Sequence, residues 1–356
     1  MAADVSVAPP EVRRVPARPA SPYARRFAWT VVAITVGAVL VSALAGPGSG
    51  AAPAVPLAWL LFVGSSVHVT ATLGLFSFTE VRAHARLHPS RYLLAPAALL
   101  MVTIAACLVL PSHAMSLPLL GLFAWQLWHY QKQNLGLASL AAASARLPAL
   151  SSVERRCILA SGVGGVLALV ARPSTLQLVS WRPGAPIASA TLVLAEVVLG
   201  ASATAAVACV RRRWRASAPG RPAIAVYLLA VCFPAPLVLT SSPYAAVGGL
   251  TLAHGLQYLL LVGHVMVGSS PRRNAELDGT RLVALIALVV AAAGGLAAAT
   301  HLHGRDDVFA RVLFGAYLAV VMTHFVIDAG VWRLRDEFPR RWLGERIPEL
   351  LGRPTV

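Results

Sequence analysis

The stretch Thr251–Ser270, TLAHGLQYLLLVGHVMVGSS, is an apolar segment long enough for one transmembrane helix, yet it contains two histidines. At 100° per residue, His254, Gln257 and Tyr258 fall on one face of such a helix, with His264 at the flank. Ionisable and amide side chains cost free energy in hydrocarbon, so in membrane helices they face the interior of a bundle and usually act there. The stretch therefore predicts a membrane helix that turns a polar face towards a buried site.

The composition extends this prediction to the whole chain. Apolar residues make up 57% of the sequence and charged residues 12%, and the mean hydropathy is +0.70. Apolar runs of about 18 to 25 residues recur along nearly the entire length, as expected for helices that cross a bilayer. These values exclude a soluble globular protein and predict an all-α, polytopic transmembrane bundle, because a β-barrel needs short alternating segments instead of solid apolar runs.

Ten spans are predicted, between a disordered tail (residues 1–26) and a C-terminal amphipathic tail (residues 333–356) that lies at the membrane interface. The spans within the bundle (residues 27–332) are Phe27–Gly46, Ala54–Phe78, Leu93–Leu110, Met115–Leu140, Cys157–Ala171, Ile187–Val210, Ala223–Leu239, Ala245–Gly268, Leu282–Thr300 and Val308–Trp332. Pro234 and Pro236 are expected to kink the seventh. Ala43-Leu44-Ala45 resembles a signal-peptide cleavage site, so removal of the first span is an alternative.

The distribution of charge predicts the topology. The net charge is +16, and the arginines are concentrated in both tails and in alternate loops, for example at Arg211–Arg213. The intervening loops contain few basic residues. This asymmetry predicts that both termini and the basic loops face the cytoplasm, where they contact anionic lipid headgroups. The arginines thus act as topology signals and do not indicate binding of nucleic acid. The strong use of arginine and alanine points to a bacterial source and hence to a multi-pass protein of the bacterial inner membrane.

Histidines recur in spans that run in one direction. The second, fourth, eighth and tenth spans carry His68, His129, His254, His264 and His324. At 1.5 Å per residue, His68 and His324 each lie about 13–15 Å from the cytoplasmic end of their helix. We therefore expect one site in the cytoplasmic half of the bundle to collect most of these imidazoles.

Polar residues accompany the histidines at helical spacing. Gln133 and Gln257 share faces with His129 and His254, and Asp328 follows His324 by one turn. A carboxylate in that position can fix the tautomer of an imidazole or act as a metal ligand itself. Asp328, Gln133 and Gln257 are therefore predicted ligands or partners of ligands. Tyr258 and Lys132, the only lysine in the chain, are candidates for proton delivery.

Imidazoles on several helices are a typical ligand set for iron, copper or zinc. Four or five histidines with a carboxylate predict a site for one or two non-haem iron ions. Iron in a membrane protein in turn predicts an oxidoreductase that acts on a lipid-soluble substrate and receives electrons from a separate redox partner. The pattern loosely resembles membrane oxygenases with histidine-coordinated iron, namely the desaturase and hydroxylase group and the bacterial family that cleaves β-carotene to retinal. The HxxHH boxes of the desaturases are absent from this sequence.

Three other readings of the same residues stay open. A transporter or proton-coupled permease would use His324 and Asp328 as a proton relay and would need no metal. A haem protein would use two of the histidines as axial ligands. A scaffold for the assembly of another membrane complex is the third. The sequence contains no Walker phosphate loop, no GxSxG and no HExxH, which disfavours an ATP-driven pump and the hydrolases that carry these motifs.

Overall fold

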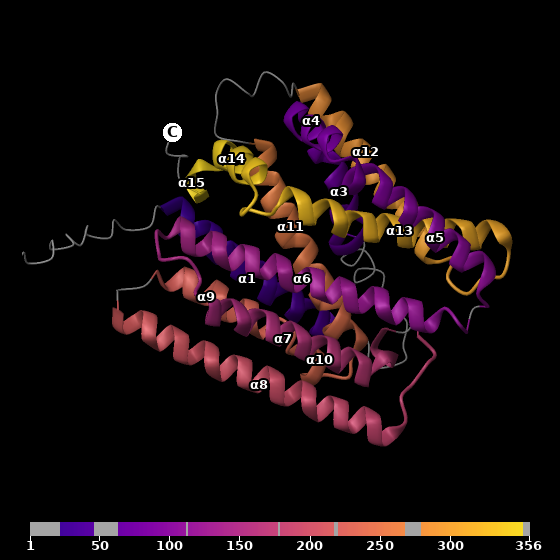
Figure 1. Ribbon diagram of the computed structural model, residues 1–356, viewed down its shortest axis with the longest axis horizontal. Helices are drawn as coiled ribbons and strands as arrows, with labels where there is room; N and C mark the ends of the chain where they lie inside the picture. The colour runs from indigo at the N-terminus through magenta and orange to yellow at the C-terminus, as the bar shows by residue number, and fades with distance from the viewer. Residues whose placement is uncertain are drawn as a thin grey trace, which may run out of the picture.

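A computed structural model describes residues 22–45, 63–111, 113–176, 179–216, 220–267 and 279–351, and within these ranges all regular structure is helical (Figure 1). Within the described residues, six helical stretches are long and apolar enough to cross a membrane. They are Pro22–Leu44, Ser90–Val109, Ala185–Trp214, Tyr244–Val267, Val283–Thr300 and Val308–Val331. The helical, multi-pass character predicted from the sequence is therefore confirmed, whereas the number of ten spans and the side on which the termini lie remain predictions.

The predicted spans are helical over most of the residues that the structure describes. The elements are α1 Pro22–Ala45, η1 Val63–Val67, α3 His68–Leu75, η2 Ser90–Leu94, α5 Ala95–Val109, α6 Ser116–Ser144, α7 Ser152–Ala171, α8 Ala185–Ala216, α9 Arg221–Cys232, α10 Pro236–Leu239, η4 Tyr244–Gly248, α11 Gly249–Val267, α12 Gly279–Thr300 and α13 Val308–Val331. Helix α1 begins at Pro22, so residues 22–26 are helical although the sequence placed them in the tail. Residues 1–21 of that tail, and the beginning of the second span, lie outside the described residues.

Several of the predicted spans are interrupted, one of them at a proline. The seventh predicted span divides into α9 and α10 around Pro234, because a proline lacks the N–H that continues the helical ladder. In addition, single π-helical turns precede α3 and α11, at η1 and η4. Such turns widen the helix locally and occur frequently at functional sites. Here they lie directly before the helices that carry His68 and His254.

Close backbone approaches bring the helices of the bundle together. A Cβ atom at Gly64 would lie 2.5 Å from the Cα of Leu252, and one at Gly255 would overlap the carbonyl group of Gly64. The backbones of η1 and α11 therefore touch, which only glycine permits. A similar approach joins α13 to α5, where a Cβ at Gly315 would lie 2.7 Å from the Cα of Ile104. On the other side of α11, α6 packs against α7, and α7 packs against α8 (Figure 1).

The C-terminal segment, which the sequence predicts to lie at the membrane interface, forms two short helices that pack on the bundle. After α13 the chain forms α14 Glu337–Arg346 and α15 Pro348–Leu351. Their apolar side chains Trp342, Leu343 and Leu350 are buried in the same core as Phe78 of the bundle. These side chains are thus covered by the protein itself, and the position of the segment at the membrane interface remains a prediction.

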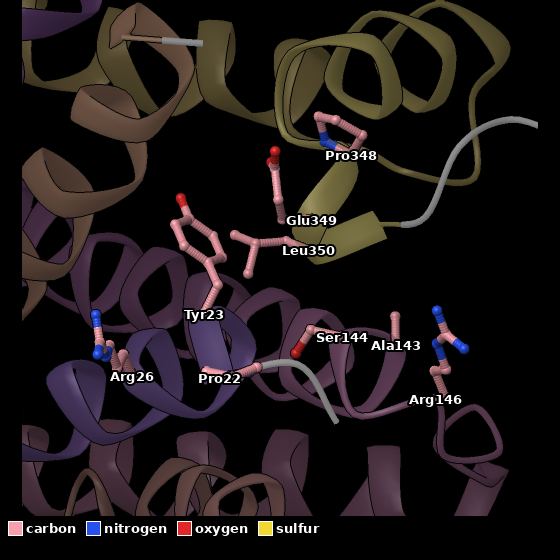
Figure 2. Close-up of a pocket in the computed structure, with 9 residues that line it drawn as sticks. All are labelled: Pro22, Tyr23, Arg26, Ala143, Ser144, Arg146, Pro348, Glu349 and Leu350. Carbon is pink, nitrogen blue, oxygen red and sulfur yellow. The ribbon is translucent and has the colours of Figure 1, made fainter. Parts of the chain in front are cut away.

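A cavity of about 500 Å³ lies between the start of α1, the end of α6 and α15 (Figure 2). Its lining includes Tyr23, Arg26, Arg146 and Glu349. None of the predicted site histidines line it, so this cavity is separate from the polar cluster described next.

Candidate metal centre

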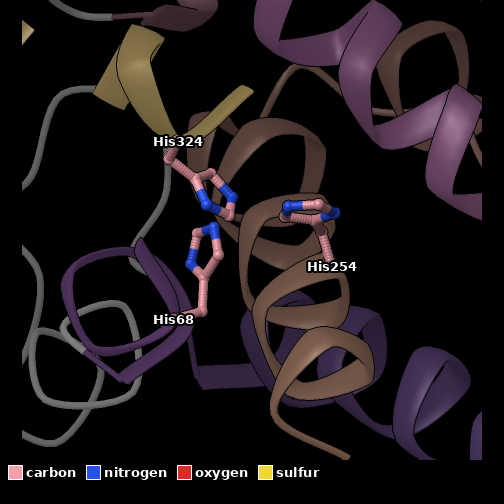
Figure 3. Close-up of side chains that lie close together, drawn as sticks. All are labelled: His68, His254 and His324. Carbon is pink, nitrogen blue, oxygen red and sulfur yellow. The ribbon is translucent and has the colours of Figure 1, made fainter. Parts of the chain in front are cut away.

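Four of the five predicted histidines meet in the interior of the bundle. They come from α3, α6, α11 and α13, and their rings contact one another edge to face. The ring centroids are 4.9 Å apart for His68 and His254, 5.1 Å for His254 and His129, 5.2 Å for His129 and His324, and 5.0 Å for His324 and His68. Each of the four imidazoles thus contacts two others, and three of the four are drawn in Figure 3.

Ligand atoms converge in two overlapping groups. One nitrogen from each of His68, His254 and His324 lies within 4.8 Å of the others, and the same limit holds for atoms of His129, His324 and Asp328. His324 belongs to both groups. The Oδ2 atom of Asp328 lies 3.5 Å from Nε2 of His324 and 3.7 Å from Nε2 of His129. Since metal–nitrogen bonds measure about 2.0–2.1 Å for zinc, ligands that share one ion lie within about 4.2 Å of each other, and movements below 1 Å would bring these atoms into range.

The local sequence explains why the rings meet. His68 is the first residue of α3, directly after the π-helical turn η1, and His254 precedes Gly255. Because the backbones of Gly64 and Gly255 touch, the two helices are closer at this point than side chains would otherwise allow. His68 and His254 therefore contact each other directly, and both are at most 2% exposed.

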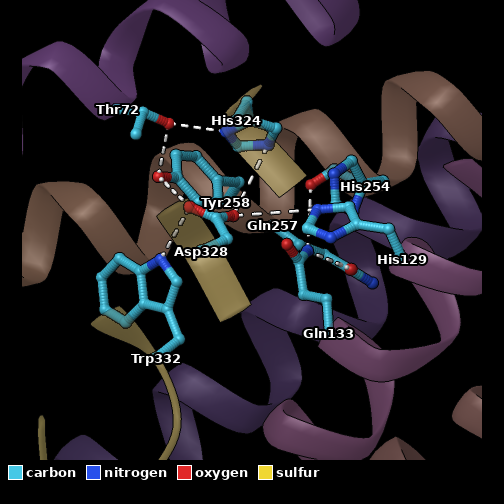
Figure 4. A network of polar contacts seen from close by, with 9 residues as sticks. All are labelled: Thr72, His129, Gln133, His254, Gln257, Tyr258, His324, Asp328 and Trp332. Atoms are coloured by element: carbon cyan, nitrogen blue, oxygen red, sulfur yellow. Dashed lines mark hydrogen bonds and ion pairs between the residues drawn. The ribbon is translucent and has the colours of Figure 1, made fainter. Parts of the chain in front are cut away.

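A chain of hydrogen bonds surrounds the outer side of His324 (Figure 4). Its Nδ1 lies 2.6 Å from Oγ1 of Thr72, and this hydroxyl lies 2.8 Å from the hydroxyl of Tyr258. The Tyr258 hydroxyl donates to Oδ1 of Asp328 at 3.0 Å, and the Trp332 indole N–H donates to the same oxygen at 3.3 Å.

The direction of these bonds determines the tautomer of His324. The Tyr258 proton points to Asp328, so the Tyr258 oxygen is left to accept from Thr72, and the Thr72 oxygen then accepts from Nδ1–H of His324. The Nε2 atom of His324 consequently presents a lone pair to the cluster. It faces Oδ2 of Asp328, which is a second acceptor when the carboxyl group is ionised.

The two predicted glutamines support the backbone of α11. The amide of Gln133 donates to the backbone carbonyl of His254 and to Oε1 of Gln257, each at 3.1 Å. Gln257 in turn donates to Oγ1 of Thr35 at 2.7 Å. These contacts link α6, α11 and α1 beside the histidines, and they place Gln133 and Gln257 next to the cluster as supports for α11.

Several imidazole nitrogens have no hydrogen-bond partner among the described residues. This holds for both ring nitrogens of His254 and for the Nε2 atoms of His68, His129 and His324. Buried polar atoms in native proteins are nearly always paired with protein, water or an ion. These unpaired nitrogens lie on all four rings of the cluster, whereas Nδ1 of His324 and Oδ1 of Asp328 on its outer side are bonded.

Two predicted site residues lie away from the cluster. His264 bonds through Nδ1 to the carbonyl of Leu260 at 2.7 Å, and its ring contacts Tyr23 and Phe27 of α1. Lys132 is exposed on the outer face of α6, with its ammonium 5.1 Å from the centre of the Trp128 ring. The structure thus brings Tyr258 and Asp328 into contact with the histidines but does not bring Lys132 there.

Aromatic residues that sequence reasoning did not single out also line the site. Tyr130 stacks on His254 with centroids 4.0 Å apart, and Phe325 stacks on His129 at 4.5 Å. Both are adjacent in sequence to site histidines, so helical periodicity placed them on neighbouring faces. Trp332 follows Asp328 by one helical turn, and this spacing was a signal that could have identified it.

Comparison with known proteins gives no match, because no family model, curated protein or solved structure is similar to this chain.

Proposed function

We propose that the cluster binds a metal ion, with non-haem iron preferred, and that the protein is a membrane oxidoreductase acting on a lipid-soluble substrate. The observation that carries this proposal is the set of orphaned imidazole nitrogens that converge with Oδ2 of Asp328. A lone pair on Nε2 of His324 facing a carboxylate oxygen at 3.5 Å repels it unless a cation or a proton lies between them.

The donor set favours iron among the metals that imidazole binds. Non-haem iron(II) oxygenases typically bind iron through two histidines and one carboxylate, which leaves coordination positions of the metal open for other ligands. The cluster, with three or four histidines and one carboxylate, contains this set. His68, His254 and His324 would hold the ion, and His129 and Asp328 would complete its coordination or hold a second one. When bound there, iron would supply activation of dioxygen.

The packing weighs against haem. A porphyrin held by two of these histidines would have to be inserted between rings that already contact one another at about 5 Å between centroids. Tyr130 and Phe325 cover further faces of the rings.

The protein's own residues would orient and screen the site. The chain from Trp332 through Tyr258 and Thr72 holds one oxygen of Asp328 and one nitrogen of His324, so their remaining atoms point to the cluster. His129 is the least buried of the four rings, with 10% of its side chain exposed against 1% for His324. A hydrophobic substrate would therefore approach beside His129, between α6 and α13, from the lipid.

One pair of variants on the same helix tests the proposal. Chelator-treated protein is titrated with iron(II) under argon, and wild type is compared with His254→Ala and His264→Ala. The cluster loses a ligand only in the first variant, so wild type and His264→Ala should bind with equal affinity while His254→Ala loses at least 100-fold. Equal binding by all three proteins would refute the assignment.

The hydrogen-bonded chain itself favours a second candidate, a proton-coupled transporter. His324, Thr72, Tyr258 and Asp328 form a continuous path along which a proton can be held between a nitrogen and a carboxylate. Under that reading Asp328→Asn abolishes proton uptake by proteoliposomes, and chelator treatment leaves the uptake unchanged.

A further inference from the structure

Two charged side chains stand on the outer surfaces of long helices, away from the helix ends. Lys132 lies near the middle of α6 and Glu196 lies within the apolar part of α8, in the sequence LVLAEVVLG. Both are exposed. Among the described residues, Glu196 has no hydrogen bond or ion pair. The ammonium group of Lys132 lies over the Trp128 ring. Helix α8 is one of the six stretches that can cross a membrane, so an exposed carboxylate there would face hydrocarbon at a large energetic cost.

The two charges lie at the same level along the bundle. The guanidinium of Arg213, near the end of α8, donates to the carbonyls of Pro148 and Ala149 in the loop that follows α6, so the C-terminal ends of the two helices lie at the same end of the bundle. Lys132 precedes Arg146 by 14 residues, and Glu196 precedes Arg211 by 15. At 1.5 Å per residue these separations are about 21 and about 22 Å. Opposite charges thus stand at one depth on two different helices.

The described part of the chain does not pair these two charges with each other. Helix α7 packs between α6 and α8 (Figure 1), and no ion pair joins Lys132 to Glu196. Neither charge finds an oppositely charged partner within the described residues, and this favours a partner on another molecule. A second copy in the same membrane, with the same orientation, offers the complementary charge at the same depth.

Each charge is accompanied by space for a neighbouring helix. Gly136 follows Lys132 by one turn, and Gly200 follows Glu196 by one turn. A Cβ atom at either glycine would meet nothing within 4 Å. Glycines on an outer face let another helix approach closely in a membrane, where small residues favour helix association.

From this arrangement we propose that copies of this chain associate in the membrane through an ion pair between Lys132 of one copy and Glu196 of the next, with α6 of one packed on α8 of the other. Each contact joins the α6 surface of one copy to the α8 surface of the next. When this contact repeats around an axis normal to the membrane, the copies form a closed ring in which both charges of every copy are paired. The association does not depend on metal in the histidine cluster.

Charge reversal tests the pairing. Lys132→Glu and Glu196→Lys each place like charges opposite one another, whereas the double variant restores the opposite pair in reversed order. The number of chains per particle and the dissociation constant are measured in lipid nanodiscs and by single-molecule photobleaching in vesicles. Glu337→Lys serves as the control, because it makes the same charge change on α14, where Glu337 is 82% exposed.

The proposal predicts oligomers for wild type and Glu337→Lys, at least a tenfold weaker association for each single reversal, and recovery to within about threefold of wild type in the double variant. Lys132→Gln and Glu196→Gln provide the same comparison where a reversal fails to fold. A monomeric wild type, an unchanged single variant, or a double variant that does not recover would each overturn it.

Discussion

The contact between Gly64 and Gly255 is the feature that holds His68 against His254, and a single methyl group tests its importance. In Gly255→Ala the new Cβ would overlap the Gly64 carbonyl group and lie 2.7 Å from the Gly64 Cα, whereas ordinary Cβ contacts lie at 3.4–4 Å. Both partners are backbone, so no side-chain rotation can relieve the overlap. The two helices must separate by about 1 Å, at a cost of about 1–3 kcal/mol for overpacking.

A matched control lies on the same helix. Gly263 of α11 has open space around its Cα, so Gly263→Ala gains helix propensity, about 1 kcal/mol, without a clash. The same gain applies at Gly255 and cancels in the comparison. Gly255→Ala should therefore be less stable than Gly263→Ala by about 1–3 kcal/mol, with the upper end expected because the clash is between backbones.

The separation also moves one histidine away from the other. If a bound ion must pull the helices back together at a cost of about 3 kcal/mol, its affinity falls by about 100-fold, since about 1.4 kcal/mol corresponds to a factor of ten. Thermal unfolding in detergent and iron(II) titration measure the two effects. Equal stability and equal iron affinity in the two variants would refute the role of this helix contact.

Three further predictions follow from contacts around the site. Thr72→Val breaks the link between Nδ1 of His324 and Tyr258 and should lower metal affinity about 10- to 100-fold, while Thr72→Ser retains it, as measured by competition with a chromogenic chelator. Gln131 is fully buried and donates to the carbonyls of Ile158 and Ala230 at 2.7 Å. Gln131→Ala leaves a cavity and removes these hydrogen bonds, so it should lower the free energy of unfolding by about 2–4 kcal/mol, as measured by denaturant unfolding. His84 of α4 Thr79–Leu87 stacks on Phe338 at 4.0 Å, and burial, followed by the nearby charges of His88 and Arg91, lowers its pKa. Because the folded protein binds the proton less tightly than the unfolded chain does, docking of α14 should weaken as the pH falls below about 6.5 and remain intact above it. Hydrogen exchange of α14 should show this, and His84→Phe should remove the pH dependence.

Much of the fold could be predicted because the apolar runs are long and the arginines mark their ends. The predicted spans are helical over most of their described residues, since the bilayer demands continuous apolar segments. The segment after residue 332 was less predictable. An apolar face such as that of Trp342 and Leu350 has the same pattern whether lipid or protein covers it, and here it is protein.

Most residues of the site could be predicted from the sequence, but the sequence did not show which histidines lie outside it. Helix periodicity put His254 and Tyr258 on one face, and the common direction of the helices put four histidines near one level. The same reasoning included His264, because its residue type matched, but its position nearly three turns beyond His254 directs it to α1. The close approach of Gly64 and Gly255 depends on which helices are neighbours, and one sequence does not state that.

Metal content of the purified protein tests the central proposal most directly. The protein is extracted from membranes in detergent without chelator, shown to be monodisperse, and analysed for metal per chain together with its visible spectrum. The proposal predicts one or two iron ions per chain, no haem absorption band, and loss of the iron in His254→Ala and His324→Ala but not in His264→Ala. Folded protein without stoichiometric metal would contradict the proposal and favour the transporter.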